Sequence, residues 1–345
     1  MAPTPVPAAT PRLGGFGVAP SMTTLRNAAS ATLLADGRVL IVGGSAGGHS
    51  LTSAELFSPD TGTFTATGSM TYARSWQTAT SLPGGRVLIV GGSGNKSAEI
   101  YNPANGRFSR TSATKDTLFY QTATALNDGR VFIAGGTTGA TYLAKAEIYN
   151  PFTGKFSRVA RSMHDAREFA SAVLLPDGRV LIAGGDQGIS KKSRIIVPGA
   201  EIFDPATGRF RQAASMHYGR SHFELVLLSN GSVLAIGGLS TGVYAGITTS
   251  AEIYDPNTNT WTVTGPMSIG RSDFSATLLA DGRVLVAGGG DNSSEIFDPS
   301  TATFQMAHDM LNARVSQTAT LLADTRVLMA GGNVTGDTAA EFYDP

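Results

Sequence analysis

Two glutamates, Glu168 and Glu224, fall outside a pattern that accounts for the other seven glutamates of the chain. Each of those seven follows Ala or Ser in a dipeptide that recurs along the sequence, which argues for a structural role. Near an apolar wall such as Phe169, the pKa of a carboxyl group rises, and the group can then transfer protons at neutral pH. With His222 and Asp273, the two glutamates are the candidate acid and base residues of an enzymatic site. A satisfied polar cluster without a catalytic role is the alternative.

Histidines and long connecting segments gather in the same part of the chain. His164 and His217 precede the two non-repeat glutamates, and Tyr218 and Tyr244 lie close by, so these four residues are candidates for contacting a ligand. The two longest segments that follow a Gly-Gly pair are residues 186–199 and 239–250. No histidine has the HxH or HExxH spacing of a metal site, so we expect no metal and no cofactor.

A repeat supplies the elements that must position these residues. A run such as GRVLIVGG at 37–44, which ends in a Gly-Gly pair, recurs seven times, and these terminal pairs are spaced 43 to 53 residues apart. Spacing of this length indicates a repeated structural unit. The first glycines of the pairs are Gly43, Gly91, Gly135, Gly184, Gly237, Gly288 and Gly331.

Each unit divides into four short strands. An inner strand, such as residues 76–82, is followed by a turn of the Asp-Gly kind, which favours a tight hairpin, and then by the run that ends in Gly-Gly. A variable loop leads to a third strand of the AEIYNP kind, and a fourth strand begins with an aromatic residue. β-branched residues dominate and no segment has a helical period, so we expect an all-β fold.

The order of the Gly-Gly pair, the Tyr or Phe of the third strand and the Trp or Phe of the fourth strand resembles the kelch repeats of bacterial-type proteins, over residues 14–345. The resemblance implies a seven-bladed β-propeller, with one four-stranded blade per repeat around a central channel. It also implies that the loops after the Gly-Gly pairs and the loops before the inner strands share one face, here called the mouth. Some kelch propellers are copper radical oxidases, whose cofactor needs a cysteine crosslinked to a tyrosine. The chain has no Cys, so that activity is not expected.

The two ends of the repeat array complement each other. The seventh unit stops at residues 339–345, one strand short. Residues 14–22 align with residues 259–267, which places Phe16 where another fourth strand has Trp261. We therefore expect the N-terminal strand to close the last blade, because this pairing removes an exposed sheet edge.

Residues 1–13 alternate Pro with small residues, which is typical of an extended tail. We expect this Pro-rich tail to precede a single propeller domain at residues 14–345. The segment has no basic start and no apolar core, so it is not a signal peptide. Two interpretations stay open: an exported chain, secreted or periplasmic, whose signal is absent from this sequence, and a cytoplasmic chain.

An arginine recurs four residues after a repeated Met in six units, and Leu118 holds this position in the third unit. A ring of guanidinium groups at the mouth would suit a carboxylate or sulfate ligand, with Arg167, Arg220 and Arg271 beside the acidic candidates. The alternative pairs each arginine with a repeat glutamate in a structural role, because both sets recur with the units. The six arginines are Arg26, Arg74, Arg167, Arg220, Arg271 and Arg314.

Two positions after the arginine, three consecutive units carry the aromatic residues Trp76, Tyr120 and Phe169, and the next units carry polar residues. Rings can stack against the apolar face of a sugar or another amphipathic ligand, while polar groups opposite bind its hydroxyls. These three residues are therefore predicted ligand contacts, with packing between blades as the alternative. The seven residues at this position are Ala28, Trp76, Tyr120, Phe169, His222, Asp273 and Ser316.

Glu224 is the sharpest single candidate. A carboxylate near a channel is costly unless it is hydrogen-bonded or protonated, and every other unit has a small hydroxyl residue at its position. The aligned residues are Ser30, Thr78, Thr122, Ser171, Ser275 and Thr318.

Composition excludes several classes of function. The 26 Lys and Arg residues balance 26 Asp and Glu residues, so no basic surplus points to nucleic acid. No apolar run approaches the length of a membrane span.

Two classes of function remain. The first, which we favour, is a monomeric binding module that recognises a glycan, a peptide or another small amphipathic molecule at the mouth. The second is an enzyme of the lyase, isomerase or hydrolase type, with acid and base residues in blades four to six, acting on a sugar or small amphipathic substrate. A flat mouth would favour binding, and a deep, partly apolar pocket with Glu224 at its base would favour catalysis.

Overall fold

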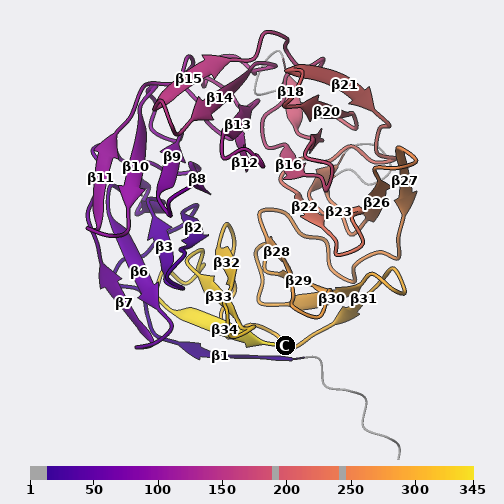
Figure 1. Cartoon of the computed structure of the whole chain (residues 1–345). Coiled ribbons are helices and arrows are strands. Elements are labelled where there is room, and N and C mark those ends of the chain that lie inside the picture. The colour runs from indigo at the N-terminus through magenta and orange to yellow at the C-terminus, as the bar shows by residue number, and fades with distance from the viewer. Residues whose placement is uncertain (1–13, 189–193, 241–245) are drawn as a thin grey trace, which may run out of the picture.

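The computed structural model describes residues 14–188, 194–240 and 246–345. Seven four-stranded antiparallel sheets form blades around a central channel, which confirms the expected all-β, seven-bladed kelch propeller (Figure 1). Within these ranges no helix has the length and apolar character needed to cross a bilayer. The predicted tail at residues 1–13 lies outside the described residues.

Each blade runs from an inner strand at the channel to an outer strand at the rim. The innermost strands are β2 (Ser30–Leu33), β8 (Thr78–Ser81), β12 (Thr122–Ala125), β16 (Ser171–Leu174), β22 (Glu224–Leu227), β28 (Ser275–Leu278) and β32 (Thr318–Leu321). The second strands are β3 (Val39–Val42), β9 (Val87–Val90), β13 (Val131–Ala134), β17 (Val180–Ala183), β23 (Val233–Ile236), β29 (Val284–Ala287) and β33 (Val327–Ala330). The third strands are β6 (Ala54–Ser58), β10 (Ala98–Asn102), β14 (Ala146–Asn150), β20 (Ala200–Asp204), β26 (Ala251–Asp255), β30 (Ser294–Asp298) and β34 (Ala340–Asp344). The outer strands are β7 (Thr63–Ala66), β11 (Arg107–Arg110), β15 (Lys155–Arg158), β21 (Arg209–Ala213), β27 (Thr260–Val263), β31 (Thr303–Met306) and β1 (Gly15–Ala19).

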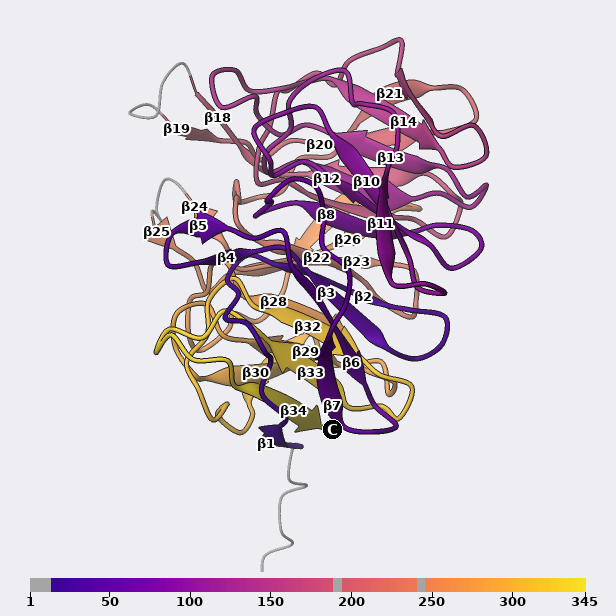
Figure 2. The same cartoon turned by 90° about the vertical axis from the view of Figure 1, so that its left-hand side faces the viewer.

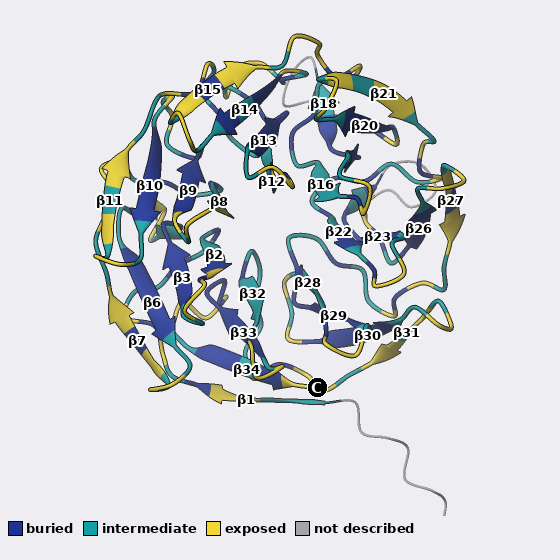
Figure 3. Ribbon diagram, viewed as in Figure 1, coloured by how far each residue is buried: buried dark blue, intermediate teal, exposed yellow. Residues whose placement is uncertain are grey.

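The apolar runs before each Gly-Gly pair form the second strands, and all four residues of every second strand are buried. Their sequences are continuously apolar because a neighbouring blade covers each face. In the described residues, each of seven buried clusters combines side chains from two adjacent blades. Figure 3 shows burial concentrated in the second and third strands and exposure along the outer ones. Packing between blades is therefore the main apolar contact of the fold.

The Gly-Gly pairs are required by backbone geometry and by close approach of the next blade. Both glycines of each pair have positive φ, 58–79° at the first and 66–102° at the second, a region that other residues rarely adopt. The second glycine donates its N–H to the carbonyl at the Arg position of the following blade at 2.7–2.9 Å, seven times around the ring, and Gly332 closes the circle on Arg26. A Cβ on Gly43 would lie 2.7 Å from the carbonyl oxygen of Arg74.

The six recurring arginines are fully buried and bind within their own blades. Each donates Nη1 to the carbonyl of the first glycine of its Gly-Gly pair at 2.7–3.0 Å. Each also pairs with the repeat glutamate of the third strand at 2.7–3.4 Å. That glutamate accepts backbone N–H groups from the loop before the arginine, as Glu99 does from Thr71 at 2.8 Å. The structure therefore shows the arrangement in which each recurring arginine pairs with a repeat glutamate in a structural role.

Blade three keeps the glutamate and lacks the arginine. Leu118 is buried in the apolar cluster between blades two and three, and Glu147 binds the backbone N–H groups of Lys115 and Asp116. Burial, with no guanidinium bonded to it, raises the pKa of the Glu147 carboxyl above its ordinary value. The Leu118 carbonyl still accepts the N–H of Gly92, so the contact between blades is retained.

The N-terminal strand closes the ring. β1 pairs antiparallel with β34 over Gly15–Ala19, so the seventh blade gains its fourth strand. Phe16 lies opposite Tyr343 with ring centroids 5.1 Å apart, the same contact that the third and fourth strands make in other blades, such as 5.0 Å between Tyr254 and Trp261.

Three small hairpins follow Gly-Gly pairs and project from one face of the propeller (Figure 2). They are β4–β5 (Ser45–Ala46 and His49–Ser50), β18–β19 (Asp186–Gly188 and Arg194–Ile196) and β24–β25 (Leu239–Ser240 and Gly246–Ile247). Backbone bridges such as Glu168 to Asp186 and Ser221 to Leu239 join these segments to the loops before the inner strands. The two kinds of loop therefore share the mouth, as expected.

Deleting residues 1–22 should lower the melting temperature by about 5 °C or more, because the edge of β34 is exposed and the Phe16 contact is lost. Calorimetry at a fixed scan rate measures this change. Deletion of residues 1–13 alone is the control, since it leaves β1 in place. Equal melting temperatures for the two deletions would contradict the role given to β1.

Arg74→Ala should lower the free energy of unfolding by about 3–5 kcal/mol, because it leaves Glu99 and the Gly91 carbonyl buried without their partner. Chemical denaturation measures this loss. Arg74→Leu is the matched variant, since blade three tolerates Leu118 at this position, and it should cost less than Arg74→Ala. If Arg74→Ala unfolds with the same free energy as the wild type, the buried pair does not stabilise the blade.

Candidate functional site

One residue from each blade forms a ring at the mouth end of the channel, and we call these seven residues the entrance ring. All have left-handed backbone conformation, with φ of 50–57°. This conformation is strained for residues other than glycine and persists only where the surroundings impose it. Backbone hydrogen bonds from blade to blade do so, such as His222 N–H to the Phe169 carbonyl at 3.3 Å and Ser316 N–H to the Asp273 carbonyl at 2.7 Å. The entrance ring is Ala28, Trp76, Tyr120, Phe169, His222, Asp273 and Ser316.

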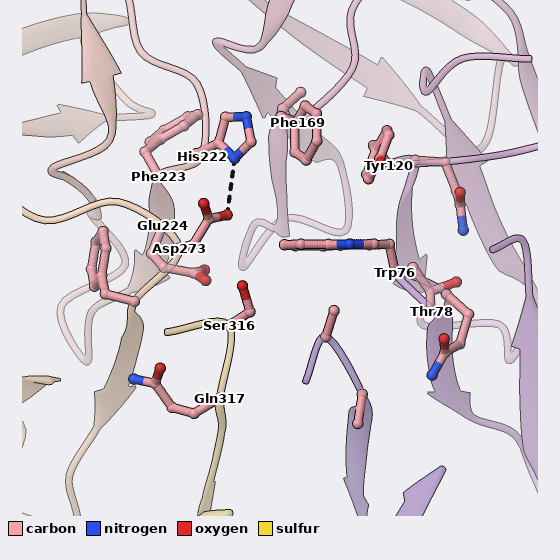
Figure 4. Close-up of a pocket in the computed structure, with 16 residues that line it drawn as sticks. Trp76, Thr78, Tyr120, Phe169, His222, Phe223, Glu224, Asp273, Ser316 and Gln317 are labelled. Carbon is pink, nitrogen blue, oxygen red and sulfur yellow. Dashed lines mark hydrogen bonds and ion pairs between the residues drawn. The ribbon is translucent and has the colours of Figure 1, made fainter. Parts of the chain in front are cut away.

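The side chains of the entrance ring line a pocket of about 240 Å³ (Figure 4). Residues one or two positions after the ring members complete the lining, and Glu224 is one of them. The structure thus brings together six residues that the sequence singled out. They are Trp76, Tyr120, Phe169, His222, Glu224 and Asp273.

Four rings form the aromatic side of the pocket. Phe169 lies between Tyr120 and His222 in a stack, with centroids 4.0 Å from Tyr120 and 3.6 Å from His222. Trp76 meets Tyr120 and Phe169 edge to face at 5.7 and 5.9 Å. Figure 4 shows the Trp76 indole reaching across the entrance toward Asp273 and Glu224. Because the rings pack on one another, they form a rigid wall rather than separate mobile side chains.

The polar side of the pocket contains three titratable groups. His222 Nδ1 lies 2.9 Å from Asp273 Oδ1, a hydrogen bond that fixes both side chains. Burial, and secondarily the charge of Asp273, raises the pKa of the Glu224 carboxyl to about 8. Glu224 keeps a partial exposure, which is to the channel because it begins the innermost strand of blade five. Within the described residues we find no hydrogen bond to its carboxyl group, and the raised pKa favours its protonated form at neutral pH.

Sequence reasoning missed three glutamines that brace the pocket from below. Gln77, Gln121 and Gln317 each donate Nε2 to a second-strand carbonyl of the preceding blade, at 2.7–3.0 Å. They occupy the position after the entrance ring, where blades five and six have Phe223 and Phe274. The sequence does contain a signal for this role: Gln recurs at one repeat position although the entrance-ring residue before it differs from blade to blade.

The expectation that Arg167, Arg220 and Arg271 contact a ligand at the mouth is wrong. Each guanidinium is fully buried and bonded to a glutamate and to backbone carbonyls of its own blade. None of the three lines the pocket. The Nη groups of each guanidinium bond within the blade and the Nε atom is buried, so no donor of these arginines is presented to the mouth.

Glu168 does not join Glu224 in the pocket. It precedes the entrance-ring residue Phe169, and its backbone pairs with Asp186 in the mouth loop. It is buried and lies outside the lining. Proton transfer by Glu168 at this pocket is therefore not supported.

Three further predicted ligand contacts, His164, His217 and Tyr218, do not line the pocket. The side chains of His164 and His217 are 65 % and 53 % exposed and hydrogen-bond to Asp165 and Glu252. Tyr218 is partly buried and does not line the cavity, and Tyr244 lies outside the described residues. A second hollow of about 450 Å³, lined by residues such as Tyr142 and Ile195, is larger and has no carboxyl group or histidine in its described lining.

Comparison with protein families finds the Kelch motif at residues 27–71, 119–163 and 226–268, in three of the seven blades. The other blades repeat the same strands, Gly-Gly pair and buried glutamate. The chain is a kelch-repeat β-propeller. A sequence comparison with curated proteins gives no significant match to this kelch propeller.

Solved structures share its fold at low sequence identity. One is a novel fungal alcohol oxidase with catalytic diversity among the AA5 family, in complex with copper, with a TM-score of 0.78 and 17 % identity over 96 % of this chain and 76 % of that one. Another is the structure of YjhT, with a TM-score of 0.57 and 14 % identity over 70 % of this chain and 84 % of that one. In the described part of this kelch propeller, no three His, Cys, Asp or Glu side chains are grouped to hold a metal ion, so its residues do not fit a copper centre.

The free energy of unfolding of Glu224→Gln should increase relative to that of the wild type as pH rises from about 4.5 to about 8. In this range the unfolded chain releases the Glu224 proton and the folded chain retains it, so rising pH favours unfolding of the wild type. The gain should reach on the order of a few kcal/mol at the upper end.

Chemical denaturation at about pH 5 and about pH 8.5 measures the difference between the two proteins. The control is Asp309→Asn, which removes an exposed carboxylate and should show no comparable trend. A gap between Glu224→Gln and wild type that is the same at both pH values would contradict the raised pKa.

Proposed function

We propose that the pocket at the entrance ring binds a small amphipathic ligand. The observation that carries this proposal is the division of one cavity into a rigid aromatic wall and a polar wall. The Trp76 indole offers an apolar surface, and Asp273, His222 and Glu224 offer hydrogen bonds opposite. A ligand with an apolar face and polar substituents satisfies both walls at once.

The size of the pocket limits what can enter. A volume of about 240 Å³ is below the roughly 300–1,000 Å³ of sites that enclose a drug-sized ligand. A glycan or a peptide would therefore enter with one sugar ring or one side chain, and the rest of it would lie over the mouth loops. A free small molecule of similar size would be enclosed entirely.

The entrance ring also favours tight recognition because it is preorganised. Backbone hydrogen bonds fix the left-handed conformation of its residues, and ring stacking fixes Tyr120, Phe169 and His222. Little side-chain freedom is then lost when a ligand binds, which lowers the entropic cost of binding.

Acid–base catalysis on a sugar or similar substrate, of the lyase, isomerase or hydrolase type, is the second candidate. It is favoured by one observation: Glu224, at the start of β22 and two residues after His222, shares the pocket with the His222–Asp273 pair, and its pKa is raised to about 8. A protonated carboxyl next to a hydrogen-bonded His and Asp can act as an acid with a base close by. Loss of turnover in Glu224→Gln, with ligand binding retained, would select this candidate over simple binding.

A thermal-shift screen of monosaccharides, amino acids and small amines should yield ligands, whose affinities are then measured by calorimetric titration. Trp76→Ala should weaken binding about tenfold by removing the apolar wall. The variant should fold, because blade one has Ala28 at the same left-handed position.

Phe152→Ala is the control, since Phe152 is 74 % exposed and does not line the pocket. It should leave affinity unchanged. If Trp76→Ala binds every ligand as the wild type does, the entrance ring is not the binding site and the proposal fails.

A further inference from the structure

The ionisable groups of the pocket are acids, apart from His222, which is hydrogen-bonded to one of them. Its described lining contains the titratable side chains of Tyr120, His222, Glu224 and Asp273, and it contains no Lys or Arg. The arginines that follow the same repeat are buried against glutamates and carbonyl groups. A ligand carboxylate, sulfate or phosphate would therefore meet Asp273 without a cation to compensate it, which disfavours anions.

The two carboxyl groups of the pocket are not equally compensated. Asp273 has the His222 ring at 2.9 Å, and we find no such partner for Glu224 among the described residues. The charge of Asp273 opposes ionisation of Glu224, so repulsion between the two carboxyls arises whenever Glu224 loses its proton. A positive group placed between the two carboxyls would relieve this repulsion and bind both.

The aromatic wall suits the same positive group. Trp is the ring that attracts a cation over its face most strongly. Trp76 crosses the entrance toward both carboxyls (Figure 4). The ring members from blades one and seven, Ala28 and Ser316, have small side chains and also line the pocket. Tyr120 and Phe169 are stacked on each other, which leaves Trp76 as the main available face.

We infer that, if the pocket binds a ligand as proposed above, the ligand carries an organic ammonium group that rests against the Trp76 indole and beside Asp273 and Glu224. A pocket of about 240 Å³ matches an ammonium group with a few carbons better than an extended molecule. The ligand class is therefore a small amine, a quaternary ammonium compound or the cationic end of a longer chain.

The two tryptophans of the chain make the test direct. Trp76 lies in the pocket, whereas Trp261 is buried in blade five and donates its indole N–H to the Ala214 carbonyl at 2.9 Å. In a nitrogen-15 spectrum, the Trp76 indole signal reports binding and the Trp261 signal is an internal reference. The probes are choline and butylammonium, each titrated beside its neutral counterpart of similar shape, 3,3-dimethylbutan-1-ol or butan-1-ol.

We expect the cations to shift the Trp76 signal at millimolar concentrations or below, and each neutral counterpart to bind about tenfold more weakly. Asp273→Asn should weaken cation binding about tenfold and weaken binding of the neutral counterparts much less. Asp309→Asn, at an exposed site, should change neither the binding of the cations nor the binding of the neutral counterparts.

Binding of the cation should also strengthen from about pH 6 to about pH 9, because a bound cation favours the ionised form of Glu224. The titratable groups that share the lining with Glu224 are Tyr120, His222 and Asp273. The part of the trend due to Glu224 is identified by its loss in Glu224→Gln.

The outcomes separate the two proposals. Equal binding of each cation and its neutral counterpart, or binding of sugars but not of the cations, would overturn the ammonium inference and leave the amphipathic binding site standing. A Trp76 signal that no screened compound shifts would overturn both. Shifts of Trp261 equal to those of Trp76 would show a general effect on the fold, and would also overturn the inference.

Discussion

The fold depends on one hydrogen bond repeated seven times, from the second glycine of each Gly-Gly pair to the carbonyl at the Arg position of the next blade. This bond fixes the segment that enters each inner strand. In six blades the same segment is fixed from within by the buried Arg–Glu pair. Glycine is needed on one side because φ is positive and a Cβ would strike the neighbouring backbone. The partner at the Arg position is a backbone carbonyl, which is why Leu118 can replace arginine without opening the ring.

The same constraint places the candidate site. Two residues beyond each Arg position, the chain has a left-handed conformation, and backbone hydrogen bonds between neighbouring blades, such as Trp76 N–H to the Ala28 carbonyl at 3.0 Å, support it. Backbone groups carry the strain, so the side chains at this position can vary without loss of the fold. Ala28 and Trp76 have nearly the same φ, 52° and 57°. The scaffold therefore repeats strictly up to the entrance ring, and the ring itself differs from blade to blade, as expected where ligand recognition resides.

Sequence reasoning predicted most of the scaffold because each repeated residue has one repeated partner. The closing strand followed from Phe16, whose contact with Tyr343 matches the third-to-fourth-strand contact of other blades. In the site, alignment of the repeats located the entrance ring and Glu224, since residues at one repeat position share one place in the fold. Alignment could not show that Glu168, one residue before the ring, is buried outside the pocket lining. Nor could it place exposed loop residues such as His164 and His217, whose positions depend on local hydrogen bonds that no repeat enforces.

The central claim is that ligand chemistry is concentrated at the entrance ring rather than in the larger hollow between the loops of blades three and four. Crystallographic screening with a library of small polar and cationic fragments tests this claim most directly, because it reports every occupied site. The account predicts that bound fragments gather against Trp76 with polar atoms toward Asp273 and Glu224. Fragments that occupy the hollow beside Tyr142 and Ile195, or the rim of the propeller, and leave the entrance ring empty would contradict it.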